Sequence, residues 1–408
     1  MNMGGSQPEF YRYIVVGCGG VGSGALYWLS RRVGKDVLGL EQFSLGHDNG
    51  GSQDHSRIIR LMYWDDMYTK LTPDTYKAWA EVERESGVQL VYKTGGLQFA
   101  STRGKDRHVL TAYEVAMRKQ HIPFERWTAA HIRRRFPQFV VPDYIEAVYQ
   151  ADGGLVDAAM ANSVHVQLAR AHGATVQDNC PVTRVDPLPD GQLLVHTTKG
   201  IYRCEKLVVA AGAWINHVLG SLGAHIPVTV TQEQVTYLQT PHVKEFTKQK
   251  FPIYIFCDNG VDYYGLPSHG NSFSKLGIDV GGREVTADTR TFTPDPTVQQ
   301  RCVDFLKRYI PKAVGPVAYT KTCLYTMTQD RDFVVDTLHT KNLPNVVVCC
   351  GAGHAFKFAS LLGKILSEMA IDGTTQYDIS GFSMNRPAVA DPMFKPTFHI
   401  EQQVQAKL

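Results

Sequence analysis

Hydrophobic and polar positions near the start of the chain follow the pattern of a strand, a helix and a second strand. Residues 13–16 form a short apolar run, and a glycine-rich stretch follows at 17–22. Apolar residues at 25, 26 and 29 then lie on one face of a helix. A second apolar run, DVLGLE, ends at Glu41. We therefore predict a βαβ unit at the N-terminus.

Two later segments repeat the change from an apolar strand to a turn of small residues. YRCEKLVVAAGAW reaches such a turn at Gly212, and LPNVVVCCGAGHAF reaches one at Gly351–Gly353 before a helix. We expect both segments to join the first strands in one nucleotide-binding sheet. The stretches between them, about 89–151 and 223–325, contain alternating patterns such as FSKLGIDV, which predict a second, sheet-based domain.

The glycines of the first turn predict a dinucleotide-binding site. Gly17, Gly19 and Gly22 form a GxGxxG pattern that follows a strand and opens a helix, and Glu41 closes the next strand. Glycine lets the backbone approach a pyrophosphate at the helix N-terminus, while a carboxylate at Glu41 accepts hydrogen bonds from a ribose. The pattern alone leaves NAD(P) and FAD both open.

The composition narrows the class of protein. Of 408 residues, 43% are hydrophobic and 20% charged, which suits a large buried core in two or three domains. A net charge of +3 indicates neither a nucleic-acid nor a membrane-surface partner, and no apolar stretch reaches the roughly 18 residues of a membrane span. Eight cysteines show neither CxxC pairs nor metal-finger spacing. We expect reduced thiols, no bound metal and a small-molecule ligand inside the cell.

Several segments together resemble the monomeric sarcosine oxidase family, flavoenzymes that oxidise secondary amino acids and include peroxisomal sarcosine and pipecolate oxidases. The resemblance spans nearly the whole chain. It rests on GCGGVG with LEQF, GSQDHSRIIR, DYYGLP, KTCLYTMTQD and GAGHAFKF.

The resemblance implies an α/β fold with a discontinuous, Rossmann-like FAD-binding domain of the glutathione-reductase type and an antiparallel-sheet substrate domain. We expect the FAD-binding domain at 1–88, 152–222 and 326–388, the substrate domain at 89–151 and 223–325, and a C-terminal tail at 389–408. In the family, the cysteine that matches Cys323 bonds through sulfur to the flavin 8α-methyl group. Gly212, Gly353 and His354 would complete the cofactor site.

The same resemblance assigns roles around the substrate. Arg60 and Lys357 match the cations that hold the substrate carboxylate, which an arginine fork or a lysine charge neutralises. Lys275 matches a lysine that promotes reaction with O2, because a fixed cation stabilises the developing negative charge. We also place Arg57 and Tyr264 among the catalytic residues and Tyr325 beside the substrate.

Two positions depart from the family pattern and affect the choice of substrate. The chain reads Gln53-Asp54-His55 where many relatives have a His-Gly pair. Asp279 stands where sarcosine oxidases carry a histidine. If Asp279 binds the substrate, it favours one with an extra cation; otherwise its side chain is turned away from the site.

The predicted reaction is oxidation of a secondary or N-methylated amino acid, such as sarcosine or pipecolate, by a monomeric enzyme. The imine product hydrolyses, and O2 is reduced to hydrogen peroxide. Two alternatives are an NAD(P)-dependent dehydrogenase and a catalytically silent flavin-binding protein. Ala406-Lys407-Leu408 matches the tripeptide that the peroxisomal import receptor reads. We therefore expect a peroxisomal location, with the cytoplasm as the alternative.

Overall fold

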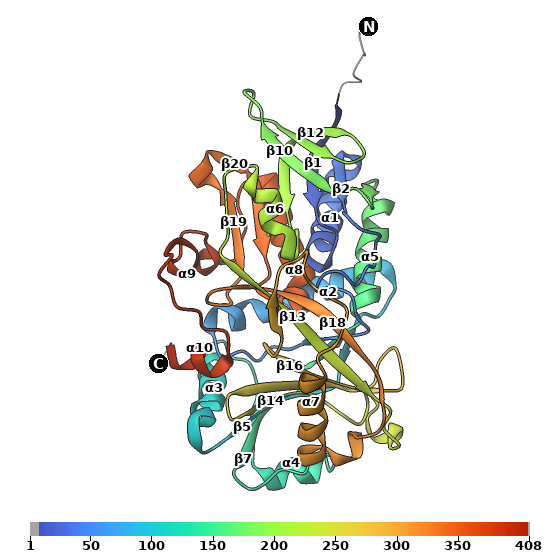
Figure 1. Cartoon of the computed structure of the whole chain (residues 1–408), viewed down its shortest axis with the longest axis vertical. Coiled ribbons are helices and arrows are strands. Elements are labelled where there is room, and N and C mark those ends of the chain that lie inside the picture. Colours follow the sequence, from blue (N-terminus) through green and yellow to red (C-terminus); the bar gives the residue numbers. More distant parts are fainter. Residues whose placement is uncertain (1–7, 407–408) are drawn as a thin grey trace.

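The computed structural model describes residues 8–406, and residues 1–7 and 407–408 lie outside this description. Lys407 and Leu408 of the predicted targeting tripeptide are therefore not described. The molecule is elongated, with one large sheet towards each end of its long axis (Figure 1). Among the described residues, no helix is both long and apolar enough to span a bilayer.

The first sheet has eight strands and contains the predicted βαβ unit. Its strands are β1 (Glu9–Val16), β2 (Val37–Leu40), β9 (Thr175–Gln177), β10 (Val182–Pro187), β11 (Leu193–Thr197), β12 (Ile201–Val209), β19 (Val334–Leu338) and β20 (Leu343–Cys350). β1 lies between β12 and β2, parallel to both, and β20 pairs with the end of β12. The α/β fold class is confirmed.

Five helices accompany this sheet, and two of them pack unusually closely. They are α1 (Gly20–Val33), α2 (Asp66–Ser86), α5 (Ala158–Ala171), α6 (Ile215–Gly220) and α8 (Ala359–Asp372). A Cβ atom added at Gly363 of α8 would lie 2.3 Å from the carbonyl carbon of Gly24 in α1. Glycine at both positions therefore lets the two helix backbones touch.

The second sheet has nine strands, most of them antiparallel. They are β5 (Gly96–Ser101), β6 (Glu125–Trp127), β7 (Ile145–Gln150), β13 (Val228–Leu238), β14 (Ile253–Asp258), β15 (Val261–Leu266), β16 (Ser274–Asp279), β17 (Arg283–Val285) and β18 (Val317–Thr328). β3 (Arg57–Ile59), β8 (Gly154–Val156) and β4 (Val91–Lys93) form a separate small sheet.

Helix α7 (Pro296–Tyr309) shows how the second sheet is covered. Asp295 caps its first amides, and Pro296 occupies its first turn. Its buried residues recur every three or four positions and join the apolar core beneath the sheet. The other described helices of this half are α3 (Val109–Lys119) and α4 (Ala129–Arg135), and α9 (Pro387–Ala390) and α10 (Ile400–Ala406) end the chain.

The chain passes repeatedly between the two sheets. The strands of the first sheet come from residues 9–40, 175–209 and 334–350, and those of the second from 96–150 and 228–328. These strands fall within the segments expected for each domain, except that β18 continues three residues past 325. The long pair β13 and β18 crosses the middle of the molecule (Figure 1).

Candidate active site

One pocket between the two sheets brings together residues that lie far apart in the sequence. The turns after β1, β2, β12 and β20 line one part of it, and side chains of β15, β16 and β18 line another. Every predicted site residue lines this pocket except Gly22. Gly22 lies within α1, where a Cβ atom would sit 1.7 Å from the carbonyl oxygen of Gly17. Its role is therefore to let the first turn close.

The glycine turn at the start of α1 forms a cradle of bare backbone. Gly17 has a φ of +90°, and a Cβ atom there would lie 2.6 Å from the carbonyl oxygen of Ala210. The amide of Gly20 donates to Ser52 Oγ at 2.9 Å. Because three of the four residues at 17–20 are glycines and the helix N-terminus is adjacent, the turn fits a pyrophosphate. The turn containing Gly212 lies beside it in the pocket.

Glu41 is held as an acceptor at the end of β2. Its carboxylate accepts from the amides of Cys18 at 2.9 Å and Phe43 at 3.0 Å, and His47 Nε2 lies 3.2 Å away. Burial by itself raises the pKa of Glu41, but the hydrogen bonds from His47 and the two amides lower it, and the net shift is downward. An ionised Glu41 can therefore accept hydrogen bonds from the hydroxyl groups of a ribose. His47 was not predicted, because no motif in the sequence singles it out.

Asp54 joins two of the predicted cations beside the second sheet. Lys275 Nζ and Arg57 Nη1 each lie 2.7 Å from Asp54 Oδ2, and the Tyr237 hydroxyl donates to Oδ1 at 2.5 Å. Asp54 and Lys275 are 3% and 4% exposed. Burial raises the pKa of the Asp54 carboxyl, but the Lys275 and Arg57 charges outweigh burial and lower it strongly.

Lys275 is consequently a buried side chain whose pKa lies close to neutral pH. Burial lowers its pKa to about 8, Asp54 opposes this shift, and the Arg57 charge adds to it. A second hydrogen bond runs from Nζ to the carbonyl oxygen of Ser56 at 2.6 Å. Asp54 was not predicted as a site residue, although its place three residues before Arg57 allows such a bridge.

Arg60 and Lys357 form a pair of cations at another part of the pocket. Arg60 Nη1 donates to the Tyr113 hydroxyl at 3.1 Å and to Gln98 Oε1 at 3.3 Å. Its buried Nε has no hydrogen-bond partner within residues 8–406. Lys357 Nζ donates to the carbonyl oxygen of His354 at 2.8 Å. Among the described residues, no carboxylate pairs directly with either cation.

The surroundings of Lys357 favour its neutral form when no anion is bound. Burial lowers the pKa of Lys357 well below its ordinary value, and the nearby Arg60 charge lowers it further. Both cations face the ring of Tyr63, at 4.5 Å for Arg60 Cζ and 5.8 Å for Lys357 Nζ. An incoming carboxylate would neutralise this pair, as the sequence predicts for Arg60 and Lys357.

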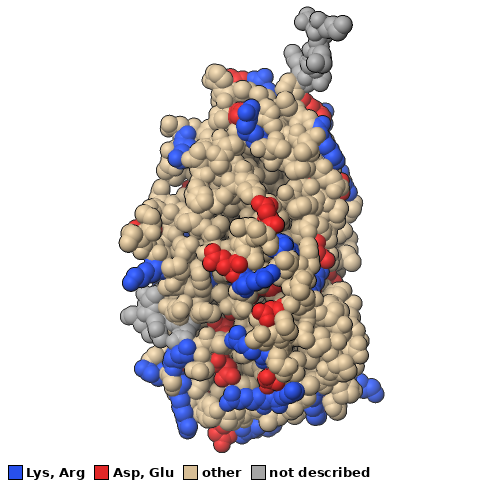
Figure 2. Space-filling model, in the orientation of Figure 1, with Lys and Arg blue, Asp and Glu red and all other residues tan. Residues whose placement is uncertain are grey.

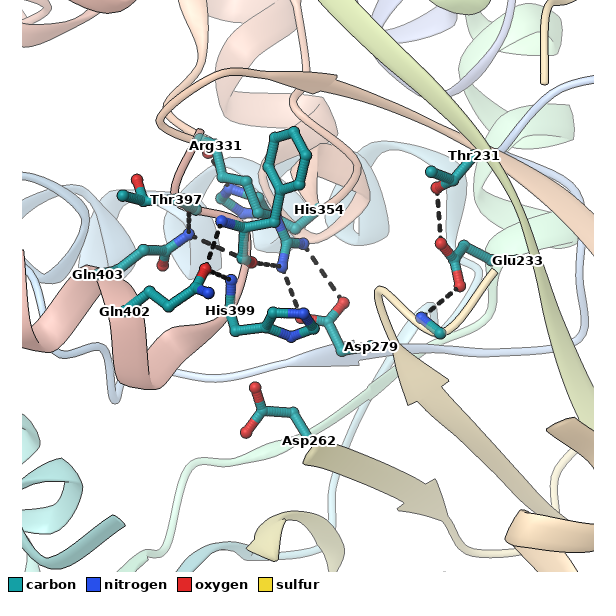
Figure 3. Close-up of polar contacts among 12 residues, drawn as sticks. Thr231, Glu233, Asp262, Asp279, Arg331, His354, Thr397, His399, Gln402 and Gln403 are labelled. Atoms are coloured by element: carbon teal, nitrogen blue, oxygen red, sulfur yellow. Dashed lines mark hydrogen bonds and ion pairs between the residues drawn. The ribbon is translucent and has the colours of Figure 1, made fainter. Parts of the chain in front are cut away.

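Asp279 is paired with a cation of the chain itself, as Figure 3 shows. Arg331 Nη1 lies 2.7 Å from Asp279 Oδ2, and Nη2 donates to Oδ1 at 3.3 Å. Burial raises the pKa of Asp279, but the Arg331 charge lowers it below its ordinary value. Arg331 thus supplies a cation for Asp279 from within the chain, and the role of Asp279 in substrate choice stays a prediction. Arg331 was missed, since nothing in the sequence links it to Asp279.

Cys323 lies in the middle of β18, directly opposite Glu233 of β13. Its side chain lines the pocket, and burial raises the pKa of the thiol while Arg57 opposes that shift. Tyr325, two residues on, packs against the glycine turn, where a Cβ atom at Gly353 would lie 2.9 Å from its ring. Tyr264 and His354 line the same pocket. Gln53 also lines it, with a buried Oε1 that has no partner among the described residues.

Comparisons with known proteins agree with this geometry. Residues 12–369 match the family model described as FAD dependent oxidoreductase. The chain is 33% identical to the monomeric sarcosine oxidase of Bacillus sp. (strain B-0618), covering 94% of this chain and 98% of that protein. It is 30% identical to the human peroxisomal sarcosine oxidase, covering 93% and 97%. The solved structure of NikD, an unusual amino acid oxidase essential for nikkomycin biosynthesis, superposes with a TM-score of 0.82 at 29% identity, covering 92% and 97%.

Proposed function

The chain belongs to the FAD dependent oxidoreductase family, and from this premise we propose that it oxidises a secondary or N-methylated amino acid. The observation that carries the proposal is the cationic pair Arg60 and Lys357, which lies in the same pocket as the glycine cradle and has no carboxylate partner among the described residues. A carboxylate is the group an amino acid presents to such a pair.

The described residues fit FAD at the other part of the pocket. The turn at Gly17–Gly20 would hold the pyrophosphate, and Glu41 would accept the ribose hydroxyls. When bound, the flavin accepts two electrons from the substrate and passes them to O2, which yields an imine and hydrogen peroxide. The protein then has to hold the substrate carboxylate at Arg60 and Lys357 and keep water away.

The remaining proposed roles belong to residues that line the pocket beside the flavin. Lys275, with its charge sustained by Asp54, would stabilise negative charge that develops on oxygen. Cys323 would carry the flavin covalently, which its place in the pocket wall and its match to the family cysteine support. Arg57 and Tyr264 would complete the wall beside it.

The decisive experiment is anaerobic reduction of the flavin by a panel of amino acids. We expect sarcosine, pipecolate or another N-methyl amino acid to bleach the flavin absorbance, and hydrogen peroxide to appear when O2 is admitted. Primary amino acids of the same size serve as the control. If no secondary or N-methylated amino acid bleaches the flavin, the chain is a silent flavin-binding protein and the proposal is wrong.

We also propose that the enzyme is a monomer and that it works in the peroxisome. Relatives described as monomeric and as peroxisomal sarcosine oxidases support these two assignments. The whole chain, fused at its N-terminus to a fluorescent protein, should overlap with catalase in a eukaryotic cell. A diffuse signal that deletion of Ala406-Lys407-Leu408 leaves unchanged would contradict the location.

A further inference from the structure

The last helix of the chain forms part of the pocket wall. Ile400 and Gln403 of α10 both line the pocket, together with the catalytic and cofactor residues. Ile400 is 3% exposed, and so is Val404 one turn later on the same helix. Val404 does not line the pocket. The two residues are thus equally buried, but only Ile400 faces the space that a ligand would occupy.

Two hydrogen bonds to the backbone hold this segment in place. Arg331 Nη1, which pairs with Asp279, also donates to the carbonyl oxygen of Phe398 at 3.0 Å (Figure 3). The amide of Thr397 donates to the carbonyl oxygen of Gln329 at 2.8 Å.

The side chain of Gln403 stabilises the same turn from within. Its Nε2 donates to the carbonyl oxygen of Thr397 at 3.0 Å, as Figure 3 shows. The segment is therefore fixed at both its start and its first helical turn, so Ile400 presents a defined surface to the pocket.

The surface around Ile400 is apolar. Ile400 belongs to a buried cluster that includes Ile255 and Leu266, both of which also line the pocket. The cluster extends to Tyr113, whose hydroxyl accepts from Arg60. The apolar wall therefore adjoins the residue that would hold the substrate carboxylate.

Among the charged side chains that line the pocket near this wall, two pair with each other. Asp279 and Arg331 neutralise each other, and Arg60 and Lys357 are the cations available to the carboxylate. A substrate group that extends from the carboxylate towards α10 therefore meets apolar side chains and a neutral ion pair. An uncharged, apolar side chain or ring is favoured there.

We infer that Ile400 is a specificity-determining residue: α10 forms the wall against which the apolar side chain or ring of the substrate packs. This inference rests on the proposed function, since it concerns the amino acid that Arg60 and Lys357 would hold. According to this inference, α10 contributes to selection among secondary amino acids by the size of their side chain or ring.

The test compares a bulky with a small substrate in three variants of the holoenzyme. Let the selectivity be the ratio of kcat/KM for N-methyl-L-phenylalanine to that for sarcosine. Ile400→Ala enlarges the pocket and should raise this ratio by about 10-fold or more. Ile400→Phe fills the pocket and should lower it by a similar factor. Val404→Ala, which removes buried methyl groups of the same helix away from the pocket, should leave the ratio unchanged within about twofold.

The outcomes separate this inference from the proposed function. If the Val404 and Ile400 alanine variants move the ratio equally, α10 acts only through stability and the inference is wrong. It is equally wrong if neither Ile400 variant changes the ratio. If the wild type oxidises neither substrate, the proposed function fails for them, and the same variants are compared through dissociation constants for acetate and phenylacetate, followed by the flavin absorbance. The size preference should then shift in the same directions.

Discussion

At the scale of single residues, the buried carboxylate of Asp54 binds the two cations beside it and offsets their charge. It accepts from Lys275 and Arg57 at 2.7 Å each, and without it two like charges would share a dry site. Removing one partner from such a buried network lowers the free energy of unfolding far more than removing an exposed ion pair does, because a buried charge is left without an opposite charge. Asp54 is therefore a positioning residue for Lys275.

The pH dependence of reoxidation should reveal the charge of Lys275. Its pKa of about 8 means that the ammonium is present below that pH and is lost as the pH rises through it. The rate constant for reaction of the reduced flavin with O2 should therefore fall above about pH 8. Stopped-flow mixing of photoreduced enzyme with O2 measures this rate constant.

Two variants sharpen this prediction. Lys275→Met should slow reoxidation at every pH and remove the transition, while flavin reduction by substrate changes much less. Asp54→Asn should move the transition to lower pH, because the charge that opposes deprotonation of Lys275 is gone. If Lys275→Met slows both half-reactions equally, the lysine binds substrate or supports the structure instead.

Arg60 and Lys357 should each contribute to carboxylate binding. Losing one charge-assisted contact in a buried site costs about 1.5–3 kcal/mol, or about 10- to 100-fold in Kd. Arg60→Gln and Lys357→Met should weaken binding of a carboxylate inhibitor by that factor in a titration of the flavin absorbance. Lys364→Met is the matched control, because Lys364 pairs with Glu81 at 3.5 Å outside this pocket. Unchanged affinity in both test variants would refute the assignment.

The proposed covalent bond between Cys323 and the flavin can be tested by acid precipitation. The wild type should keep its yellow colour in the pellet, and Cys323→Ala should release it into the supernatant. Cys302→Ala is the control, because Cys302 is buried in the core of the second sheet and should leave the colour in the pellet. Colour wholly in the supernatant of the wild type would rule out the bond.

At the scale of secondary structure elements, the contact between α1 and α8 depends on two glycines. A Cβ atom at Gly363 meets the backbone of Gly24, which cannot move aside without shifting a helix. Gly363→Ala should therefore lower the free energy of unfolding by about 1–3 kcal/mol, the usual cost of overpacking a core.

A matched glycine checks that prediction. Gly220, the last residue of α6, has nothing within 4 Å of an added Cβ atom, so Gly220→Ala should change the stability little or raise it slightly. Urea unfolding followed by circular dichroism measures both variants. Equal effects of the two substitutions would show that the helix contact tolerates a methyl group.

The elements near the glycine turn were predictable because their signals are local. The apolar run, the GxGxxG turn and Glu41 all lie within one short segment, and β1, α1 and β2 appear there. The partner of Asp279 was not predictable, because Arg331 lies 52 residues away, between β18 and β19, and meets Asp279 only in the folded chain. The same holds for α10, whose seven residues show no strong periodicity but complete the pocket wall.

At the scale of the whole molecule, the pocket joins the two sheets, and a bound cofactor would tie them together. On the face that Figure 2 shows, Lys and Arg side chains are interspersed with Asp and Glu side chains without a single-sign patch. The pocket between the sheets holds the charged side chains assigned to the ligand.

Removal of FAD should therefore destabilise the entire chain. Cys323→Ala protein freed of its flavin should melt at a lower temperature than the same protein saturated with FAD, because a ligand present at 100 times its Kd stabilises by about 2.7 kcal/mol. Differential scanning calorimetry with and without added FAD measures the shift. An identical Tm despite demonstrated FAD binding would show that the unfolding transition does not involve the pocket.

The ribosome delivers β1 long before it delivers the strand that completes its hydrogen bonds. One edge of β1 pairs with β2, which follows directly, but the other pairs with β12. About 185 residues separate these two strands, and at 5–20 residues per second their synthesis takes about 10–40 s. The nascent chain thus carries an open apolar edge for nearly half of its translation. Capture of the flavin at the proposed site has to wait longer still, because Gly353 also lines this pocket and emerges later.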